Sequence, residues 1–342
     1  MRIPRAWAVL FAVFVLMAPA CPRARAQAAL LLQDADGIAE LLSPMGHESI
    51  YFARICAASP VKLRRCRPGE PGAVIGRYHG IGGDDWLAMP AIPYFYSVEH
   101  ASQVPAHVNR ETVEGLRLAY HDARLGILGK VREGGAIHRG WNQLVGAAYE
   151  RRIWAFRFET TEAQDDAFIA RMNAEKNRSH FSIFFRNCAD FSRNVLDFYF
   201  PHAFKRHFVP DLGIVTPRQI AYELVKYGRR HPEIELTVME IPLIPGMHDS
   251  TRVGKSVAES LVVTGYIVPI AVFSPYAAGV IVADTLLWGR YPLSLDHAKV
   301  LSPQTMAALG SGPSKTTARR TKAGHGRETR EATAVLSPVR LQ

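Results

Sequence analysis

The residue of this chain with the clearest capacity for chemistry is Cys188, which follows Asn187 at a change of sequence pattern. Apolar and polar residues alternate up to Phe185, as in a strand, and apolar residues then recur at helical spacing as far as Tyr199. Unpaired N–H groups at a helix start favour an anion, so a thiol there tends to lose its proton below its usual pKa of about 8.5. The pattern predicts that Cys188 is a nucleophile at the junction between a strand and a helix. The alternative is a small buried core residue.

A nucleophilic thiol needs a base, and His47 is placed to supply one. It follows Gly46, the predicted tip of a turn, and lies at the start of a predicted strand that runs to Ile55. A histidine at a strand end is held by the sheet while its ring stays reachable. His47 could therefore pair with Cys188 as imidazolium and thiolate. The alternative is an ordinary half-buried histidine.

Two segments of the chain together resemble a known family pattern. They are Met45-Gly-His-Glu-Ser-Ile-Tyr-Phe52 and Phe185-Arg-Asn-Cys-Ala-Asp-Phe-Ser-Arg-Asn-Val-Leu-Asp197. This arrangement resembles the circularly permuted NlpC/P60-like group of papain-fold proteins, which includes the lecithin retinol acyltransferase-like enzymes and bacterial secreted or membrane proteins of unassigned activity. The resemblance covers about residues 40 to 245. It implies a papain-like α+β domain with a small antiparallel sheet packed on helices, with His47 as general base and Cys188 as nucleophile.

The same resemblance implies a third polar residue that orients the histidine. His79, in the glycine-rich segment 76–83, is the candidate if it lies on the neighbouring strand, and a loop histidine if it does not. Asn187 is a second candidate, although its place before the helix favours an N-cap. The backbone N–H of Cys188 is the expected oxyanion donor. The chain departs from the family pattern in a long insert, residues 84–150.

The cysteines point to an oxidising compartment. Residues 1–26 carry a basic start, an apolar run and a small-x-small end, which is typical of a secretory signal peptide that would remove Cys21. Cys56 and Cys66 are ten residues apart and are expected to form a disulfide, which leaves Cys188 as a free thiol. A bond from Cys188 to one of the other two would abolish the nucleophile.

The remaining patterns complete an α+β domain over residues 27–250. No phosphate-loop, dinucleotide or zinc spacing is present, so no cofactor or metal is expected. The other histidines are interpreted as surface residues. Helices are predicted over 109–130, 161–177 and from 217, and strands over 152–158 and 234–241.

Residues 261–283 contain no charge and are long enough to span a bilayer, within an apolar segment at 258–290. A re-entrant loop and a buried hairpin are the alternatives. Residues 302–342 are basic and almost without aromatic residues, which predicts a disordered tail, on the cytoplasmic side of a span. Much of the net charge of +10 comes from this tail and the signal segment, so it favours anionic lipid over nucleic acid as a partner.

These patterns together predict an exported cysteine hydrolase or acyltransferase of the bacterial cell envelope, anchored in the inner membrane with its domain outside. It would attack an amide or ester carbonyl, with cell-wall peptides placed first as substrate and lipid acyl chains second. The alternative is a catalytically inactive, membrane-anchored envelope protein with a binding or structural role.

Overall fold

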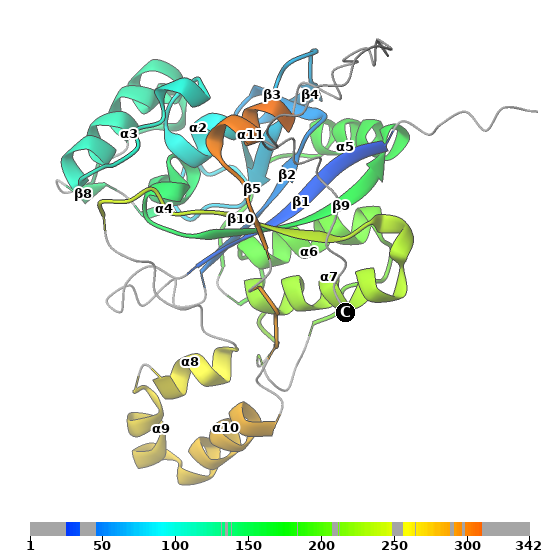
Figure 1. The fold of residues 1–342 in the computed structure, drawn as a ribbon. Coiled ribbons are helices and arrows are strands. Elements are labelled where there is room, and N and C mark those ends of the chain that lie inside the picture. The colour runs from blue at the N-terminus through cyan, green and yellow to red at the C-terminus, as the bar shows by residue number, and fades with distance from the viewer. Residues whose placement is uncertain are drawn as a thin grey trace, which may run out of the picture.

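The computed structural model confirms the α+β class. It describes residues 25–34, 46–130, 132–133, 136–137, 139–182, 184–206, 211, 213–247, 256–263, 265–287, 291–295 and 298–309. Within these ranges, ten helices surround a mixed sheet of seven strands (Figure 1). The expectation of a small, purely antiparallel sheet is therefore wrong.

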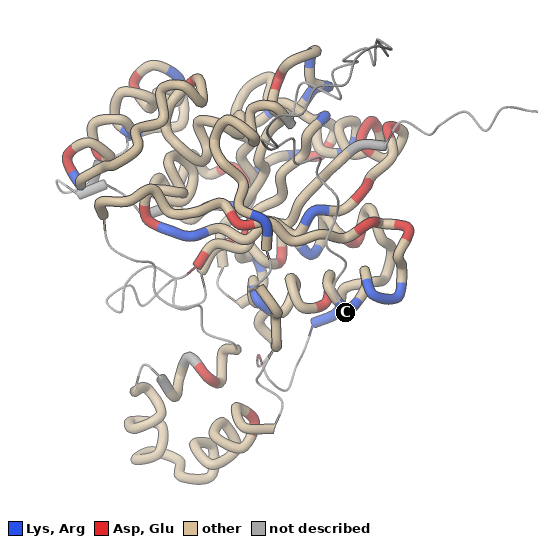
Figure 2. The backbone as a smooth tube through the Cα atoms, viewed as in Figure 1, with Lys and Arg blue, Asp and Glu red and all other residues tan. Residues whose placement is uncertain are grey.

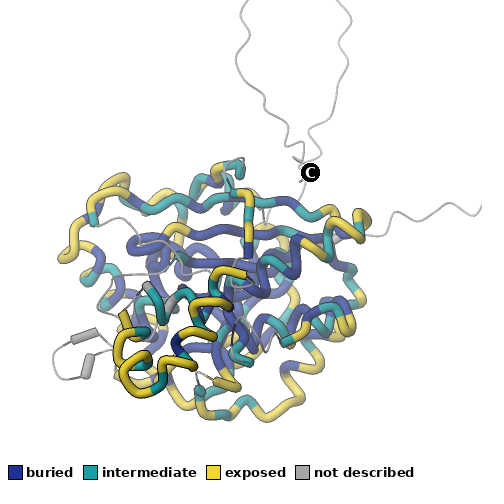
Figure 3. The backbone as a smooth tube through the Cα atoms, turned by 90° about the horizontal axis from the view of Figure 1, so that it is seen from below, coloured by how far each residue is buried: buried dark blue, intermediate teal, exposed yellow. Residues whose placement is uncertain are grey.

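The sheet is centred on a strand that the sequence analysis did not assign. The strand order is β11 (Lys299–Val300), β10 (Thr237–Ile241), β9 (Ile153–Thr161), β1 (Arg25–Gln33), β2 (His47–Phe52), β5 (Ala73–Gly76) and β6 (Leu87–Pro90). Strands β10 and β11 are parallel and the other neighbours antiparallel. Both faces of β1 are covered, and residues 28–32 of this strand are buried (Figure 3). A strand that is covered on both faces has a continuous apolar sequence, as residues 28–32 do.

The predicted signal peptide lies almost wholly outside the described residues. Its expected end, Ala26, is the second residue of β1 and pairs with Thr160 of β9. Cleavage there would leave Gln27–Gln33 in the strand. The register between β1 and β2, in which Leu30 faces Ile50, would remain.

One face of the sheet is covered by α5 (Glu162–Ala174), α6 (Cys188–Tyr199) and α7 (Pro217–Arg230). Their apolar sides pack on Ile50 and Phe52 of β2 and on neighbouring strands. Both α5 and α7 have capped starts, because the side chains of Thr161 and Thr216 accept a backbone N–H in their first turns. Burial against the sheet and capped starts together fix the position of α6.

The insert at 84–150 covers the opposite face. It forms α2 (Ala91–Tyr96), α3 (Arg110–Arg124) and α4 (Arg139–Leu144), with the 3-10 turns η1 (Ala101–Gln103), η2 (Gly126–Leu128) and η3 (Ala147–Tyr149) and the short strands β7 (Arg132–Glu133) and β8 (Ala136–Ile137). Helix α3 ends earlier than the predicted 130. Buried Arg117 anchors it by an ion pair of 2.6 Å to Glu150. The insert is therefore part of the core and not an appendage.

Several predicted elements are observed near their expected bounds, and one is wrong. Strand β9 and helix α5 match the predictions for 152–158 and 161–177, while β10 begins at Thr237 after the 3-10 turn η4 (Pro232–Ile234). The strand predicted before Cys188 is instead a tight turn, closed by a bridge between Ser182 and Arg186. Its alternating aromatic residues do not mark a buried face, since Phe184 and Phe185 are exposed.

The apolar segment forms three helices in place of the predicted span: α8 (Val257–Val263), α9 (Ile267–Phe273) and α10 (Pro275–Leu287). Gly265 has a positive φ of 80° between the first two, and Pro275 lacks the N–H that would continue α9. No helix among the described residues is long and apolar enough to cross a membrane. The chain then returns to the domain through β11 and α11 (Pro303–Leu309), so the predicted disordered tail is wrong for 303–309, while 310–342 lie outside the described residues.

Candidate functional site

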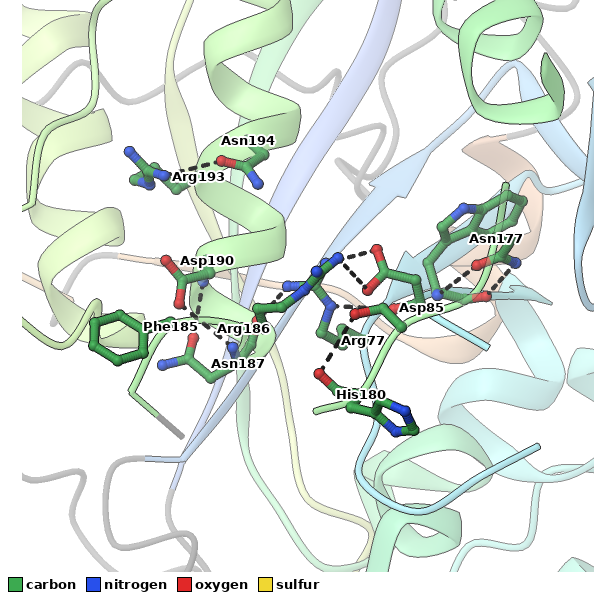
Figure 4. A network of polar contacts seen from close by, with 12 residues as sticks. Arg77, Asp85, Asn177, His180, Phe185, Arg186, Asn187, Asp190, Arg193 and Asn194 are labelled. Carbon is green, nitrogen blue, oxygen red and sulfur yellow. Dashed lines mark hydrogen bonds and ion pairs between the residues drawn. The ribbon is translucent and has the colours of Figure 1, made fainter. Parts of the chain in front are cut away.

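Cys188 is the first residue of α6, and its neighbour Asn187 is the N-cap. The Asn187 side chain accepts the backbone N–H of Asp190 at 2.8 Å, and its amide nitrogen donates to the carbonyl of Val215 at 2.9 Å. Asp190 completes a capping box by accepting the Asn187 N–H. Two independent anchors therefore hold the backbone on which the thiol is carried (Figure 4).

Charged side chains contact this helix start from two sides, and Figure 4 shows Arg77 and Asp85 on one of them. Arg77 donates to the backbone oxygen of Asn187 at 3.3 Å and forms a buried ion pair of 2.7 Å with Asp85. On the other side, Arg206 pairs with Asp190 and donates to a backbone carbonyl at 2.9 Å. Burial raises the pKa of Asp190, and Arg206 opposes that rise. Both arginines thus fix structure and are not free to bind substrate.

Cys188 is a half-buried residue, and its thiol faces backbone donors. The N–H groups of Glu48 on β2 and of Ala189 point to the sulfur. Burial, followed by the charge of Glu48, raises the pKa of Cys188 to about 12, and these N–H groups offset only part of that rise. The predicted lowering of the thiol pKa is therefore wrong for this resting structure, because desolvation outweighs the effect of the helix start.

Glu48 is a functional candidate that the sequence analysis missed. Side chains alternate along a strand, so Glu48 shares with Ile50 and Phe52 the face that α6 covers. It is fully buried, and its carboxyl oxygens have no hydrogen-bond partner among the described residues. Burial raises its pKa well above the ordinary value, although the Ser192 hydroxyl of α6 opposes the rise. Glu48 is therefore a buried carboxyl group beside the thiol, and burial disfavours its ionised form.

His47 lies on the opposite face of β2, together with Ser49 and Tyr51. Its ring packs on Tyr78 with centroids 5.2 Å apart, and its Nε2 has no hydrogen-bond partner in the described part of the chain. Burial, and then the charge of Arg151, lowers the pKa of His47 to about 3. His47 is not among the groups that shift the pKa of Cys188. These shifts favour the neutral forms of both groups near pH 7, and the pairing of His47 with Cys188 stays a prediction.

Tyr78 is the second residue that the sequence analysis missed, and it connects the two faces. It contacts the His47 ring, and burial raises its pKa, with further contributions from Tyr94 and Cys188. A side chain at Gly76 would meet the Tyr78 hydroxyl at 2.9 Å, so the hydroxyl approaches the sheet only because this residue is glycine. Tyr78 is therefore the group electrostatically coupled to Cys188 that also touches His47.

Tyr94 extends the polar layer under His47. Its hydroxyl lies 2.8 Å from the Ser49 hydroxyl and accepts a hydrogen bond from the Gln33 amide. These groups satisfy one another on the face covered by α2, where unpaired polar groups would be costly.

His79 does not lie on the neighbouring strand. It follows the end of β5 in an exposed turn, and its ring contacts Phe181 edge-on at 5.1 Å. His79 and Tyr78 line a surface pocket together with Asp84, His180 and Phe181. Its position therefore suits contact with a substrate at the rim better than orientation of His47.

The other two cysteines among the described residues are joined to each other. Cys56 and Cys66 form a disulfide in the hairpin of β3 (Ile55–Ser59) and β4 (Lys62–Arg65), with a Cα separation of 4.9 Å. Cys188 is free, so it forms a disulfide with neither of them. A Glu70 oxygen lies within 4.8 Å of both sulfurs, but sulfurs bonded to each other are not thiolate ligands for a metal.

Comparisons of the chain with protein-family models, with curated proteins and with solved structures found no match. A functional assignment therefore rests on the residues around the start of α6.

Proposed function

We propose that this protein is a cysteine hydrolase or acyltransferase of the bacterial cell envelope, with Cys188 as its nucleophile. The observation that carries the proposal is a free cysteine, half-buried at the first residue of a capped helix, with its thiol facing the backbone N–H groups of Glu48 and Ala189. Such donors stabilise negative charge next to a nucleophile, as acyl transfer requires. A helix that begins with cysteine, packed on a strand that begins with histidine, also supports a permuted papain-like arrangement.

In this mechanism the Cys188 sulfur attacks an amide or ester carbonyl. The thiol proton passes first to a base in the protein and then to the leaving group. Water or an acceptor group then releases the acyl chain from the sulfur. His47, neutral and with an Nε2 that has no hydrogen-bond partner among the described residues, takes the base position that the family resemblance implies. Glu48 adds a buried acid on the other side of the strand.

In this proposal the resting site is latent, because the two pKa values disfavour a thiolate–imidazolium pair. Proton transfer from a thiol of pKa about 12 to an imidazole of pKa about 3 is uphill by about 12 kcal/mol, too much to leave a populated ion pair. Substrate binding must therefore bring water to the thiol, or change the surroundings of the thiol and the imidazole, before the thiolate forms. The same neutral pair favours the second candidate function, a non-catalytic envelope protein that retains the fold.

Location in the envelope is supported by two features. The N-terminal 26 residues have the composition of a secretory signal, and the Cys56–Cys66 disulfide suits an oxidising compartment. In that compartment cell-wall peptides come first as substrate, and the acyl chains of lipids second.

Turnover of defined substrates tests the proposal. The full chain is incubated with peptidoglycan fragments and, separately, with phospholipid, and products are followed by mass spectrometry. Cleavage or acyl transfer is expected to be lost in Cys188→Ala and kept in the matched variant Ser59→Ala, at the exposed end of β3. Equal turnover by Cys188→Ala would refute the assignment, and turnover of phospholipid alone would reverse the order of substrates.

A further inference from the structure

The helices α8, α9 and α10 carry an apolar surface that the domain does not cover. In Figure 1 they form a group set apart from the sheet. Phe273 is 90% exposed and Tyr276 83% exposed. Each described side chain that is exposed on α9 and α10 is aliphatic or aromatic, including Val268, Val272 and Leu286. Exposed apolar surface of this extent marks an interaction site.

This surface is almost without charge. Figure 2 shows no basic residue on α8–α10, and the sequence from 257 to 287 has Glu259 and Asp284 as its only charged residues. Asp284 is turned inward, with 5% of its surface exposed, and Glu259 interacts with Arg218 of α7. A surface that docks on a protein carries a polar rim, whereas the interior of a lipid leaflet requires none.

The strands on either side of these helices determine how the segment can enter a membrane. Strand β10 precedes the helices and β11 follows them, and the two are parallel neighbours in one sheet, with Met239 opposite Lys299. The Leu301 N–H also donates to the Glu240 carbonyl at 2.7 Å. Both ends of the apolar segment therefore lie on the same side of any bilayer, which is incompatible with a single crossing.

The helix lengths agree with partial insertion. Helix α10 has 13 residues and α9 has seven, which correspond to about 20 Å and about 10 Å of helix. The hydrocarbon core of a bilayer is about 30 Å thick, so neither helix reaches across it. Basic residues flank the segment in the sequence, with Arg252 and Lys255 before it and Arg290 after it, as suits contact with anionic headgroups.

We propose that α8–α10 is a monotopic hairpin that inserts into one leaflet of an anionic membrane and holds the domain at its surface. Both flanks then stay on the side of the domain. This inference is independent of the reactivity of Cys188, since it rests on the apolar helices and on the pairing of β10 with β11.

Flotation with lipid vesicles tests insertion. The full chain is mixed with preformed vesicles of phosphatidylethanolamine and phosphatidylglycerol and separated on a density gradient. The double variant V272D/F273D should lower the bound fraction at least about tenfold, because a buried carboxylate is costly in hydrocarbon. Ile127→Asp, at a residue of η2 that is 85% exposed, is the matched control and should float like the unchanged chain. A chain that stays in the aqueous phase, or a soluble dimer that buries these helices, would overturn the proposal.

Labelling from one side tests the hairpin. Single reporters Lys226→Cys on α7 and Gln304→Cys on α11 are placed in a background with Cys21→Ser and Cys188→Ser, and treated with a membrane-impermeant maleimide after binding to preformed vesicles. Labelling of both reporters is expected. Labelling of Lys226→Cys together with protection of Gln304→Cys would indicate a crossing and contradict the hairpin.

Discussion

The chemical state of Cys188 gives a prediction that can be worked through quantitatively. With a pKa of about 12, close to one thiol in 10⁴ is ionised at pH 8, whereas a free cysteine of pKa about 8.5 is ionised in roughly one of four. Alkylation requires the thiolate. Iodoacetamide should therefore modify Cys188 in the folded chain on the order of 10³-fold more slowly than in denaturant.

Glu48→Gln separates the causes of this slow reaction. The substitution removes the charge that opposes the thiolate and keeps the backbone N–H group that points to the sulfur. The alkylation rate at pH 8 should rise, by tenfold for each unit that the pKa falls. Glu240→Gln on β10 is the matched control, since it removes a carboxylate of the same sheet that pairs with Arg152.

The assay is peptide mapping of the alkylated chain over time, at several pH values. A folded wild-type chain that reacts as fast as the denatured one would refute the raised pKa. A Glu48→Gln chain that reacts at the wild-type rate would show that Glu48 has no influence on the thiol.

Three further predictions concern stability. His47 is 2% exposed, and its pKa is depressed from about 6.5 to about 3. Its contribution to the free energy of unfolding is therefore present above pH 6.5 and falls as the pH falls, by about 2 kcal/mol at pH 5. Chemical denaturation of His47→Asn should lack this loss, and an unchanged pH slope would contradict the burial of a neutral ring. Asn187→Ala should cost about 1 kcal/mol in urea unfolding through the lost cap, and no cost would mean that the start of α6 is held by other contacts. Replacing both Cys56 and Cys66 by serine should cost about 2–3 kcal/mol and leave the number of free thiols unchanged in a thiol count; equal stability under the same conditions would argue against the bond.

Local chemistry was sufficient to predict the start of α6 and the other capped helices. Asn187, Thr161 and Thr216 are small polar residues directly before helical spacing, and each is the N-cap in the structure. These features depend on residues a few positions apart, so a sequence pattern contains them.

The electrostatics of the site could not be predicted in the same way. The pKa of Cys188 depends on burial and on Glu48, which lies 140 positions away in the chain. Strand alternation places His47 and Glu48 on opposite faces, but it does not say which face α6 will cover. Only the packing of α6 on Ile50 and Phe52 decides that Glu48 is the carboxyl on the Cys188 side.

The topology of the apolar segment also escaped prediction. Its composition suits a membrane helix, and only Gly265 and the prolines suggested a break. The decisive element is β11, a strand of two residues whose pairing with β10 has no sequence pattern of its own. Strand β1 was missed for a related reason, because its apolar run follows directly after another apolar run that was interpreted as a signal.

Direct detection of an acyl group on Cys188 tests the central claim. The full chain is incubated with peptidoglycan fragments and with phospholipid, quenched in acid, and analysed by intact mass and peptide mapping. The proposal predicts an acyl adduct on the peptide that contains Cys188, absent in Cys188→Ala. Substrate turnover with no adduct on Cys188, or with the adduct on another residue, would contradict it.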